Sequence, residues 1–328
     1  MQQEECIIVG AGPCGLSAAI ELKQMGKNPL VIEKGNIVNA IYRYPTHQTF
    51  FSTSEKLEIG DIPFLTIHRK PKRNEALTYY REVVKRKSLR INRFETVRTV
   101  QKKNNGMFSI QTDKAKYESR YVIIATGYYD SPNMLGIKGE DLPKVFHYFK
   151  EAHPYFDTDV VVIGGKNSAI DAALELQKAG ARVTVLYRGS DYSPSIKPWV
   201  LPDFEALVRD GEISMQFHSV VKEITETSLV YVTRQKEVEI PNDFVFAMTG
   251  YHPDHSFITS MGVRIDERTG RPHYDPETME TNVSNLFIAG VIAAGNNANE
   301  IFIENGRFHG GQIAAAVQKK ETHYISRP

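Results

Sequence analysis

Two stretches of this chain repeat one order of elements, and that repeat constrains the fold more than any other feature. In the first stretch, an apolar run at residues 5–9 leads into a turn with the pattern G-x-G-x-x-G at Gly10, Gly12 and Gly15. A helical pattern follows over residues 16–25. A strand, a glycine turn and a helix in this order are typical of a dinucleotide-binding unit, in which the pyrophosphate lies on the helix N-terminus.

The two stretches end in chemically different residues. The apolar run within NPLVIEK leads to Glu33, 23 residues after Gly10, where a carboxylate accepts hydrogen bonds from a ribose. The second stretch, DVVVIGGKNSAIDAALELQKAGARVTVLYR, has its turn at Gly164, and the same spacing leads to Tyr187 with Arg188 after it. A guanidinium binds a 2′-phosphate, which a carboxylate would repel. We therefore expect a cofactor without a 2′-phosphate in the first site and NADPH in the second.

The remaining segments extend this pattern to an α/β protein with two Rossmann-like dinucleotide-binding domains. Residues 94–127 predict a hairpin-rich insert that ends in YVIIATG, and FVFAMTGYHPD repeats that ending after the second unit. NVSNLFIAG predicts one more strand, and a long helix over about residues 300–318 follows. We expect the NADPH domain, residues 129–253, to be inserted in the FAD domain, residues 1–128 and 254–328. Two sites with different ribose chemistry indicate electron transfer from NADPH to a bound flavin.

Composition excludes several other classes of protein. Lys and Arg total 40 against 39 acidic residues, so the net charge favours neither a nucleic acid nor a membrane surface as a partner. No apolar run reaches the ~18 residues of a membrane span, and the first strand begins too early for a signal peptide. Cys6 and Cys14 form neither a disulfide framework nor C-x-x-C, which indicates a reducing cytoplasm. We find no metal-ligand spacing and expect no metal.

The chain resembles the thioredoxin-reductase-like flavoproteins over nearly its whole length. The paired glycine motifs, the two ATG-like turns and the closing LFIAG with its helix carry this resemblance. GAGPCG, IGGKNSAIDAALEL and NNANEIFIENGRFHGG make it more closely similar to the bacillithiol disulfide reductases. The resemblance implies a cytosolic FAD enzyme that uses NADPH to reduce the disulfide of a low-molecular-weight thiol. We also expect a homo-oligomer.

The chain departs from the thioredoxin reductase pattern at three points. It lacks the C-x-x-C pair that relays electrons in those enzymes. The acid that usually follows the last AG and holds the ribityl chain is Val291 here, and Asn296, Asn297 or the start of the last helix are candidates to replace that bond. Lys166 stands at the second glycine of the NADPH loop, where it either crowds the pyrophosphate or, as we favour, turns outward to neutralise it.

The motifs and the resemblance together assign the candidate residues of both nucleotide sites. The candidates for FAD are Gly10, Gly12, Pro13, Cys14, Gly15, Glu33, Lys34, Tyr42, His47, Ala125, Gly127, Gly290, Ile301 and Phe302. The candidates for NADPH are Gly164, Gly165, Lys166, Asn167, Ser168, Tyr187, Arg188 and Gly250.

Some of these candidates have a structural alternative. Tyr42, His47 and Ser52 lie in residues 39–64, a segment that walls the isoalloxazine ring in related folds, yet core packing also accounts for any one of them. Arg188 is alternatively a solvated strand-end charge. We interpret His309 as a helix-packing residue, and we expect N–H groups near residues 300–302 to stabilise negative charge on the reduced flavin.

Cys14 has two possible roles that the sequence leaves open. It aligns with Ser168 of the second stretch, where a small side chain suffices. Alternatively, it attacks the substrate disulfide and forms a mixed disulfide that the flavin resolves. The helix N-terminus lowers the pKa of such a thiol, whereas an adjacent pyrophosphate raises it.

Three other functions share parts of this pattern. A flavin monooxygenase carries F-x-G-x-x-x-H before its second glycine loop, and counting back from His147 gives Pro143 and Asp141 in place of glycine and phenylalanine. A ferredoxin- or flavodoxin-type NADP reductase also lacks C-x-x-C. A redox sensor that binds FAD and NADPH without turnover is a non-enzymatic alternative. Fold alone does not separate these functions.

Overall fold

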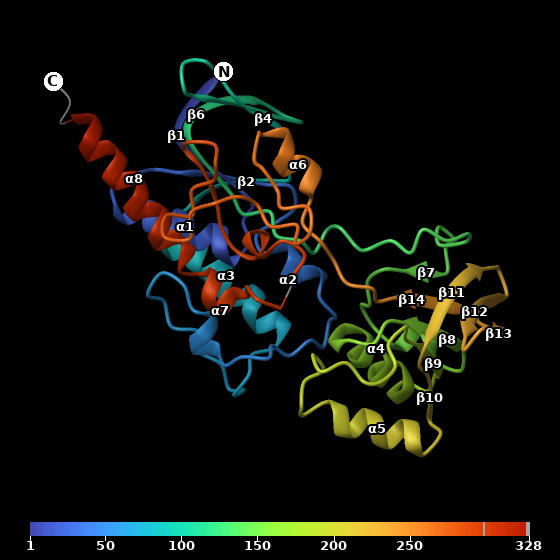
Figure 1. Cartoon of the computed structure of the whole chain (residues 1–328). Coiled ribbons are helices and arrows are strands. Elements are labelled where there is room, and N and C mark those ends of the chain that lie inside the picture. Colours follow the sequence, from blue (N-terminus) through green and yellow to red (C-terminus); the bar gives the residue numbers. More distant parts are fainter. Residues whose placement is uncertain (298, 326–328) are drawn as a thin grey trace. The chain divides into compact units, whose positions relative to one another are not determined.

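A computed structural model of the chain describes residues 1–297 and 299–325, and Figure 1 labels most of their helices and strands. The chain divides into two compact units, Met1–Ser131 with Tyr251–Pro328, and Pro132–Gly250. The sequence placed these boundaries a few residues away, after residue 128 and before residue 254.

The first unit is built on a seven-stranded sheet. Its strands are β1 (Gln2–Val9), β2 (Leu30–Glu33), β3 (Arg90–Arg93), β4 (Val97–Lys102), β5 (Phe108–Thr112), β6 (Lys116–Ile124) and β15 (Leu286–Ile288). The order is β3-β2-β1-β6-β5-β4, and β15 also pairs with β6. The β1, β2, β3, β6 and β15 pairings are parallel, and β4, β5 and β6 form an antiparallel meander. The meander is the hairpin-rich insert expected from the sequence.

Helices and short 3-10 turns complete the first unit. The helices are α1 (Pro13–Gln24), α2 (Asn39–Arg43), α3 (Arg73–Arg86), α6 (His255–Ser260), α7 (Ile303–Gly306) and α8 (His309–Ile325). The 3-10 turns are η1 (Ser54–Leu57) and η3 (Val291–Ala294). The glycine turn between β1 and α1 lies at the carboxyl end of β1, where open parallel sheets bind ligands.

The second unit contains two smaller sheets. A five-stranded parallel sheet has the order β10-β9-β8-β14-β7, and an antiparallel sheet has the order β11-β12-β13. The strands are β7 (Val145–Phe146), β8 (Asp159–Ile163), β9 (Arg182–Leu186), β10 (Ile213–Gln216), β11 (Ser219–Ile224), β12 (Ser228–Thr233), β13 (Lys236–Pro241) and β14 (Phe244–Ala247). The helical segments are α4 (Asn167–Lys178), α5 (Leu201–Arg209) and the short η2 (His153–Tyr155).

The elements near the glycine turns are longer than their sequence patterns. The first strand begins at Gln2 rather than at residue 5, and α1 begins at Pro13 rather than at residue 16. Proline is favoured at the first helical position, because a backbone N–H there would have no intrahelical acceptor and the φ of proline is already helical. The glycine turn of the first unit therefore runs directly into α1.

The long helix expected over residues 300–318 is interrupted, and this expectation is wrong. Residues 300–302 are not helical, α7 spans a single turn, and α8 begins at His309. The Asn305 side chain accepts a hydrogen bond from Phe302 N and donates one to the Glu300 carbonyl. Such side-chain bonds satisfy backbone groups that a continuous helix would pair, so the chain turns here.

The core of the first unit depends on a close approach between α1 and α8. A Cβ added to Gly310 would lie 2.8 Å from the Ala18 backbone nitrogen, so only glycine fits where these helices meet. Ala18, Ile20 and Leu22 of α1 and Ile313 and Val317 of α8 are almost fully buried.

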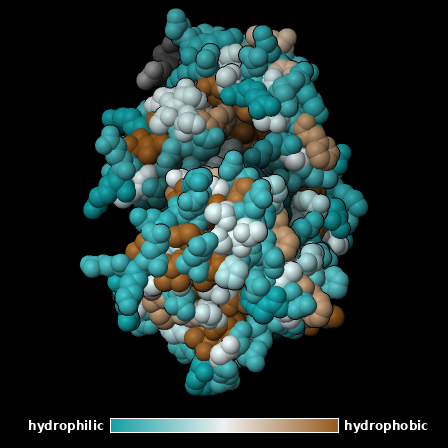
Figure 2. All heavy atoms as spheres, turned by 90° about the vertical axis from the view of Figure 1, so that its right-hand side faces the viewer, coloured by the Kyte–Doolittle hydropathy of each residue, from teal (hydrophilic) through white to brown (hydrophobic). Residues whose placement is uncertain are grey.

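The surface is mostly polar. Figure 2 shows one face, on which hydrophilic side chains predominate and hydrophobic ones appear in scattered patches. Within the described part of the chain, no helix is both long and apolar enough to cross a membrane.

Candidate nucleotide and redox sites

The first glycine turn is held in place by close backbone contacts. Gly10 has φ +109°, and a Cβ on it would lie 2.4 Å from the Ala125 carbonyl oxygen. A Cβ on Gly15 would lie 2.1 Å from the Gly10 carbonyl oxygen. A Cβ on Gly12 meets no heavy atom within 4 Å, so this position opens to free space. The first and third glycines therefore shape the turn, while the second leaves room for a ligand.

Glu33 closes the other side of this turn. The buried Glu33 carboxylate accepts hydrogen bonds from Ala11 N at 2.7 Å and from Gly35 N at 2.8 Å. Burial raises the pKa of this carboxyl, and the two backbone N–H groups act in the opposite direction. Each oxygen keeps a second acceptor site, as ribose hydroxyls require.

The turn therefore fits a dinucleotide. No side chain caps the N-terminus of α1, where Pro13 occupies the first turn and Gly12 precedes it. The N–H groups of Cys14 and Gly15 lie in the first helical turn, which has no intrahelical acceptors. These donors, the space at Gly12 and the acceptors of Glu33 together match a pyrophosphate joined to a ribose.

Cys14 lies between two glycines from other parts of the chain. Its Sγ is 2.9 Å from the position of a Cβ on Gly290 and equally far from one on Gly306. Gly290 follows β15 at φ +82°, and Gly306 ends α7. The thiol therefore occupies the space that two missing side chains leave. Burial, and secondarily the Glu304 carboxylate, raises the pKa of Cys14 to about 12.

Polar side chains complete the surroundings of Cys14. Ser52 donates a short hydrogen bond to Glu304 on α7, which connects the segment of residues 39–64 to the Cys14 region. His309 Nδ1 accepts a hydrogen bond from Gly290 N at 3.1 Å. Burial lowers the pKa of His309, so its ring is neutral at pH 7. His309 therefore fixes the Gly290 turn.

The other FAD candidates lie in different settings. Tyr42 is 55% exposed, and its carbonyl accepts hydrogen bonds from Arg73. Lys34 forms an ion pair with Asp130 at 2.8 Å, which leaves its ammonium directed at a protein partner. His47 is exposed.

The remaining FAD candidates lie near the turns of the first unit. Ala125 is buried against Gly10, and Gly127 has φ +70° in the turn after β6. Ile301 is buried beside Gly306, and Phe302, 44% exposed, precedes α7.

The residues proposed to replace the missing acid at Val291 differ in their contacts. Val291 begins η3 directly after Gly290. Asn297 bonds Glu300 at 3.2 Å, while the Asn296 side chain packs at Gly270. The last helix does not begin at residue 300, so among the elements of this segment the start of α7 is the one available to supply backbone N–H groups.

The second glycine turn has the same strand-to-helix form. Gly164 has φ +142°, and a Cβ on it would lie 2.5 Å from the Met248 carbonyl oxygen. A Cβ on Gly165 would lie 2.3 Å from the Tyr187 ring, and one on Gly189 would lie 2.4 Å from it. The Tyr187 ring therefore packs between two glycines, which explains why both positions lack a side chain.

Side chains around this turn divide into anchors and exposed groups. Asn167 donates to the Ser195 carbonyl at 2.8 Å and accepts from Lys197 N at 3.0 Å, so it anchors the 195–197 segment. Lys166 stands at the N-cap position of α4 without a side-chain capping bond and is exposed, as is Ser168.

Arg188 lies beyond the end of β9, one residue after Tyr187, which stands at the position equivalent to Glu33 of the first unit. Its side chain is exposed, and no described residue forms a hydrogen bond or an ion pair with it. Gly250, with φ +89°, bonds Asn133 in the last turn of this unit. Exposed cations at the second turn match the charge of NADPH.

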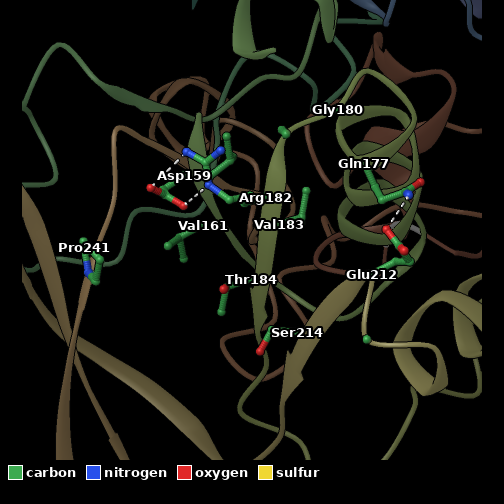
Figure 3. Close-up of a pocket in the computed structure, with 13 residues that line it drawn as sticks. Asp159, Val161, Gln177, Gly180, Arg182, Val183, Thr184, Glu212, Ser214 and Pro241 are labelled. Carbon is green, nitrogen blue, oxygen red and sulfur yellow. Dashed lines mark hydrogen bonds and ion pairs between the residues drawn. The ribbon is translucent and has the colours of Figure 1, made fainter. Parts of the chain in front are cut away.

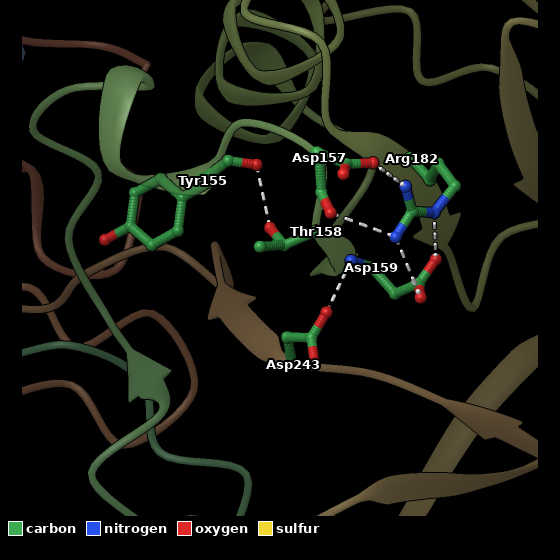
Figure 4. Close-up of polar contacts among 6 residues, drawn as sticks. All are labelled: Tyr155, Asp157, Thr158, Asp159, Arg182 and Asp243. Carbon is green, nitrogen blue, oxygen red and sulfur yellow. Dashed lines mark hydrogen bonds and ion pairs between the residues drawn. The ribbon is translucent and has the colours of Figure 1, made fainter.

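A separate cavity of about 550 Å³ lies at the opposite end of the parallel sheet of the second unit. It is lined by the amino ends of β8 and β9 and by Gly180 and Gly211, which follow α4 and α5 (Figure 3). Arg182 bridges Asp157 and Asp159 there, and Asp243 accepts from Asp159 N at 2.8 Å (Figure 4). Because nucleotides bind at the carboxyl ends of parallel strands, this cavity is distinct from the NADPH turn.

The sequence missed several residues that shape the first site. Asp130 pairs with Lys34 and Arg43, and Tyr129 packs edge-on to Tyr44 with ring centroids 5.1 Å apart. Tyr251 packs on the same Tyr129 ring at 4.6 Å. Only the aromatic run YYD after the ATG-like turn signalled this cluster. Among the described residues, no group of three or more His, Cys, Asp and Glu could hold a metal ion.

Comparison with known proteins defines the class of this chain. The family model "Pyridine nucleotide-disulphide oxidoreductase" matches residues 7–290, and the chain belongs to this family. Bacilliredoxin reductase Bdr of Bacillus subtilis (strain 168) is 69% identical over 324 residues, which cover 98% of this chain and 100% of that relative.

Solved structures agree with this classification. Bacillithiol disulfide reductase Bdr (YpdA) from Bacillus cereus is 66% identical with a TM-score of 0.96, covering 97% of this chain and 100% of that one. Thioredoxin reductase of T. acidophilum is 24% identical with a TM-score of 0.77, covering 98% and 100% of the two chains, and shares the fold. The predicted fold class, the oxidoreductase activity and the use of FAD and NADPH are thereby confirmed.

Proposed function

We propose that this protein is an NADPH-dependent flavoprotein that reduces the disulfide of a low-molecular-weight thiol, most specifically bacillithiol disulfide, in the cytoplasm. The observation that carries this proposal is the pairing of two strand–turn–helix sites with opposite ribose chemistry. Glu33, bonded into the first turn, accepts hydrogen bonds, whereas Arg188 at the second offers an exposed guanidinium that pairs with no described residue. FAD suits the first site and NADPH the second.

The two units then have separate tasks. Residues 1–131 and 251–328 bind FAD, and residues 132–250 bind NADPH. When bound, FAD would supply the two-electron chemistry that couples NADPH oxidation to disulfide reduction and that the side chains lack. The balanced reaction converts one disulfide, NADPH and a proton into two thiols and NADP⁺.

The chain itself binds and orients the reactants. The first turn of α1, with the N–H groups of Cys14 and Gly15, would hold the pyrophosphate, and Glu33 would accept hydrogen bonds from the ribose. Neutral His309 fixes the Gly290 turn against Cys14. Lys166 and Arg188 neutralise the phosphates of NADPH from the exposed side of the second turn.

Cys14 is the candidate nucleophile, since Cys6 is buried within β1. Its raised pKa means that the resting thiol is protonated, so attack requires loss of that proton when substrate binds. The alternative is that Cys14 only fills the space between Gly290 and Gly306, and that reduction proceeds without a protein thiol. Both roles agree with the absence of a second cysteine near it.

The names of the relatives indicate two different substrates, and one assay can distinguish them. One relative is named for bacilliredoxin and the other for bacillithiol disulfide. We would follow NADPH oxidation with bacillithiol disulfide, with other small disulfides and with an oxidised bacilliredoxin, using oxygen alone as the control. Bacillithiol disulfide should give the highest rate. Rates equal to the oxygen background with every disulfide would contradict the proposal, and turnover of a one-electron carrier alone would identify a ferredoxin-type reductase.

The proposed homo-oligomer has a direct test. Sedimentation of the FAD-loaded protein at micromolar concentration should give a mass that is a multiple of 37.1 kDa. A single species at 37.1 kDa would contradict it.

A further inference from the structure

Phe94 combines two unfavourable features just beyond β3. Its φ is +57°, in the left-handed region that bulky side chains rarely adopt. Its side chain is also 60% exposed, although it is a large apolar ring. Glycine or asparagine would adopt this backbone conformation more easily, and a polar side chain would be better solvated. Strain of this kind is concentrated at functional sites.

The neighbouring residues hold Phe94 in this conformation. Phe94 N donates to the Gly35 carbonyl at 2.9 Å, and Glu95 N donates to the Glu33 carbonyl at 3.0 Å. The buried Glu95 carboxylate accepts hydrogen bonds from Thr112, Tyr117 and Asn92. The Phe94 backbone is therefore fixed between the end of β2 and the start of the meander.

These contacts place Phe94 beside the ribose-binding end of the first site. The carbonyls that bond residues 94 and 95 belong to Gly35 and Glu33, and Gly35 N also donates to the Glu33 carboxylate. In an adenine dinucleotide, the purine is attached to the same ribose whose hydroxyls such a carboxylate binds. Only the ribose therefore separates the purine from Glu33. The face of an aromatic side chain is a favourable contact for a purine.

We propose that the Phe94 ring binds the adenine of FAD by stacking. This inference rests on the proposed FAD site in the first unit and adds a residue that determines selectivity for the adenine end of the cofactor. The contact would cover the ring that is now exposed, which accounts for a phenylalanine at a left-handed position.

The test uses full-length protein from which FAD has been removed, with the second site blocked by saturating 2′,5′-ADP. Binding of FAD, ADP and FMN is measured by calorimetry for wild type, Phe94→Ala and Phe94→Tyr. Stacking of a base on an aromatic side chain predicts that Phe94→Ala raises the Kd of FAD and of ADP by roughly tenfold or more. FMN, which has no adenine, should bind equally well to wild type and to Phe94→Ala. Phe94→Tyr should retain the wild-type affinity for FAD and ADP.

Two further variants separate ligand binding from a structural role. Phe94→Gly relieves the backbone strain, so the apoprotein should melt at a higher temperature while its affinity for ADP falls. Phe156→Ala, which removes a 67% exposed phenylalanine of the second unit, should change neither quantity.

The outcomes distinguish this inference from the proposed function. Wild-type affinity for ADP in Phe94→Ala, or a lower melting temperature of apo Phe94→Gly, would overturn the stacking role. A wild-type apoprotein that binds neither FAD nor ADP would instead contradict the FAD site itself.

Discussion

At the scale of single residues, the side chains of the two glycine turns differ most in their partners. Glu33 is bound by backbone N–H groups, whereas Arg188 is exposed and has no partner among the described residues. A residue without a structural contact can be replaced with little effect on the fold. The function of such a residue is therefore testable by mutation.

Arg188→Ala should raise the KM for NADPH roughly tenfold or more, since a charge-assisted contact to the 2′-phosphate is lost. The KM for NADH, which lacks that phosphate, should be little changed. Steady-state kinetics with both coenzymes check this. An equal loss with NADH and NADPH would indicate a structural role for Arg188.

Cys14→Ser tests the nucleophile. The variant should still bleach its flavin with NADPH at about the wild-type rate, because hydride transfer needs no thiol. Disulfide-dependent turnover should fall by orders of magnitude, since a hydroxyl forms no mixed disulfide. Stopped-flow absorbance and the disulfide assay measure the two steps separately.

Turnover at the wild-type rate would leave Cys14 a packing residue. Cys14→Val should then weaken FAD binding by overfilling the space at Gly290 and Gly306.

At the scale of elements, the sequence predicted the strands and turns better than the last helix. The glycine spacing predicted both strand–turn–helix units, because each turn contains positions where a Cβ would collide with backbone or ring atoms and only glycine fits. The late start of α7 was missed, because the Asn305 side-chain bonds to residues 300 and 302 that stand there depend on the folded geometry and leave no distinct sequence pattern. Phe94 and Asp130 were missed as well, since their roles depend on contacts between distant segments.

Gly310 and Gly311 form a matched pair on α8. Gly310→Ala should lower the free energy of unfolding by about 2–4 kcal/mol, because its Cβ would press on the Ala18 backbone. A Cβ on Gly311 would meet no heavy atom within 4 Å, so Gly311→Ala should stabilise the helix by up to about 1 kcal/mol. Denaturant unfolding of the two variants compares them. Equal effects would mean that α1 and α8 leave room for a methyl group at Gly310.

Asp171 on α4 gives the stability of the second unit a pH dependence. Burial, and secondarily Glu175, raises the pKa of Asp171 to about 6. Because the pKa is raised only in the folded state, the full free energy of unfolding is present below about pH 4, where the carboxyl is neutral in both states. The free energy of unfolding then falls as the pH rises through 6 and the carboxyl ionises in the folded protein. Asp171→Asn should therefore increase the free energy of unfolding at pH 7.5 by about 1–3 kcal/mol, with little change at pH 4. Denaturant titrations at both pH values measure this, and a pH-independent effect would show that ionisation of Asp171 is not its cause.

At the scale of the whole molecule, the two units should respond to different ligands. Removing FAD should increase amide hydrogen exchange at residues 10–16, 125–127, 290–297 and 299–306, and adding NADP⁺ should protect residues 164–168 and 187–189. Exchange measured by mass spectrometry on apo, FAD-loaded and NADP⁺-bound protein checks both. Protection of residues 164–189 by FAD alone would reverse the assignment of the two sites.

The parallel pairing of β15 with β6 has a consequence for how the protein is made. Leu286 stands in register with Val122, so a strand near the end of the chain completes a sheet whose other strands are synthesised much earlier. On the ribosome, residues 132–250 emerge before β15 does, and they contain every strand of their own two sheets. The inserted unit can therefore finish folding during translation, whereas the surrounding unit must wait, with one sheet position open, until β15 has left the exit tunnel.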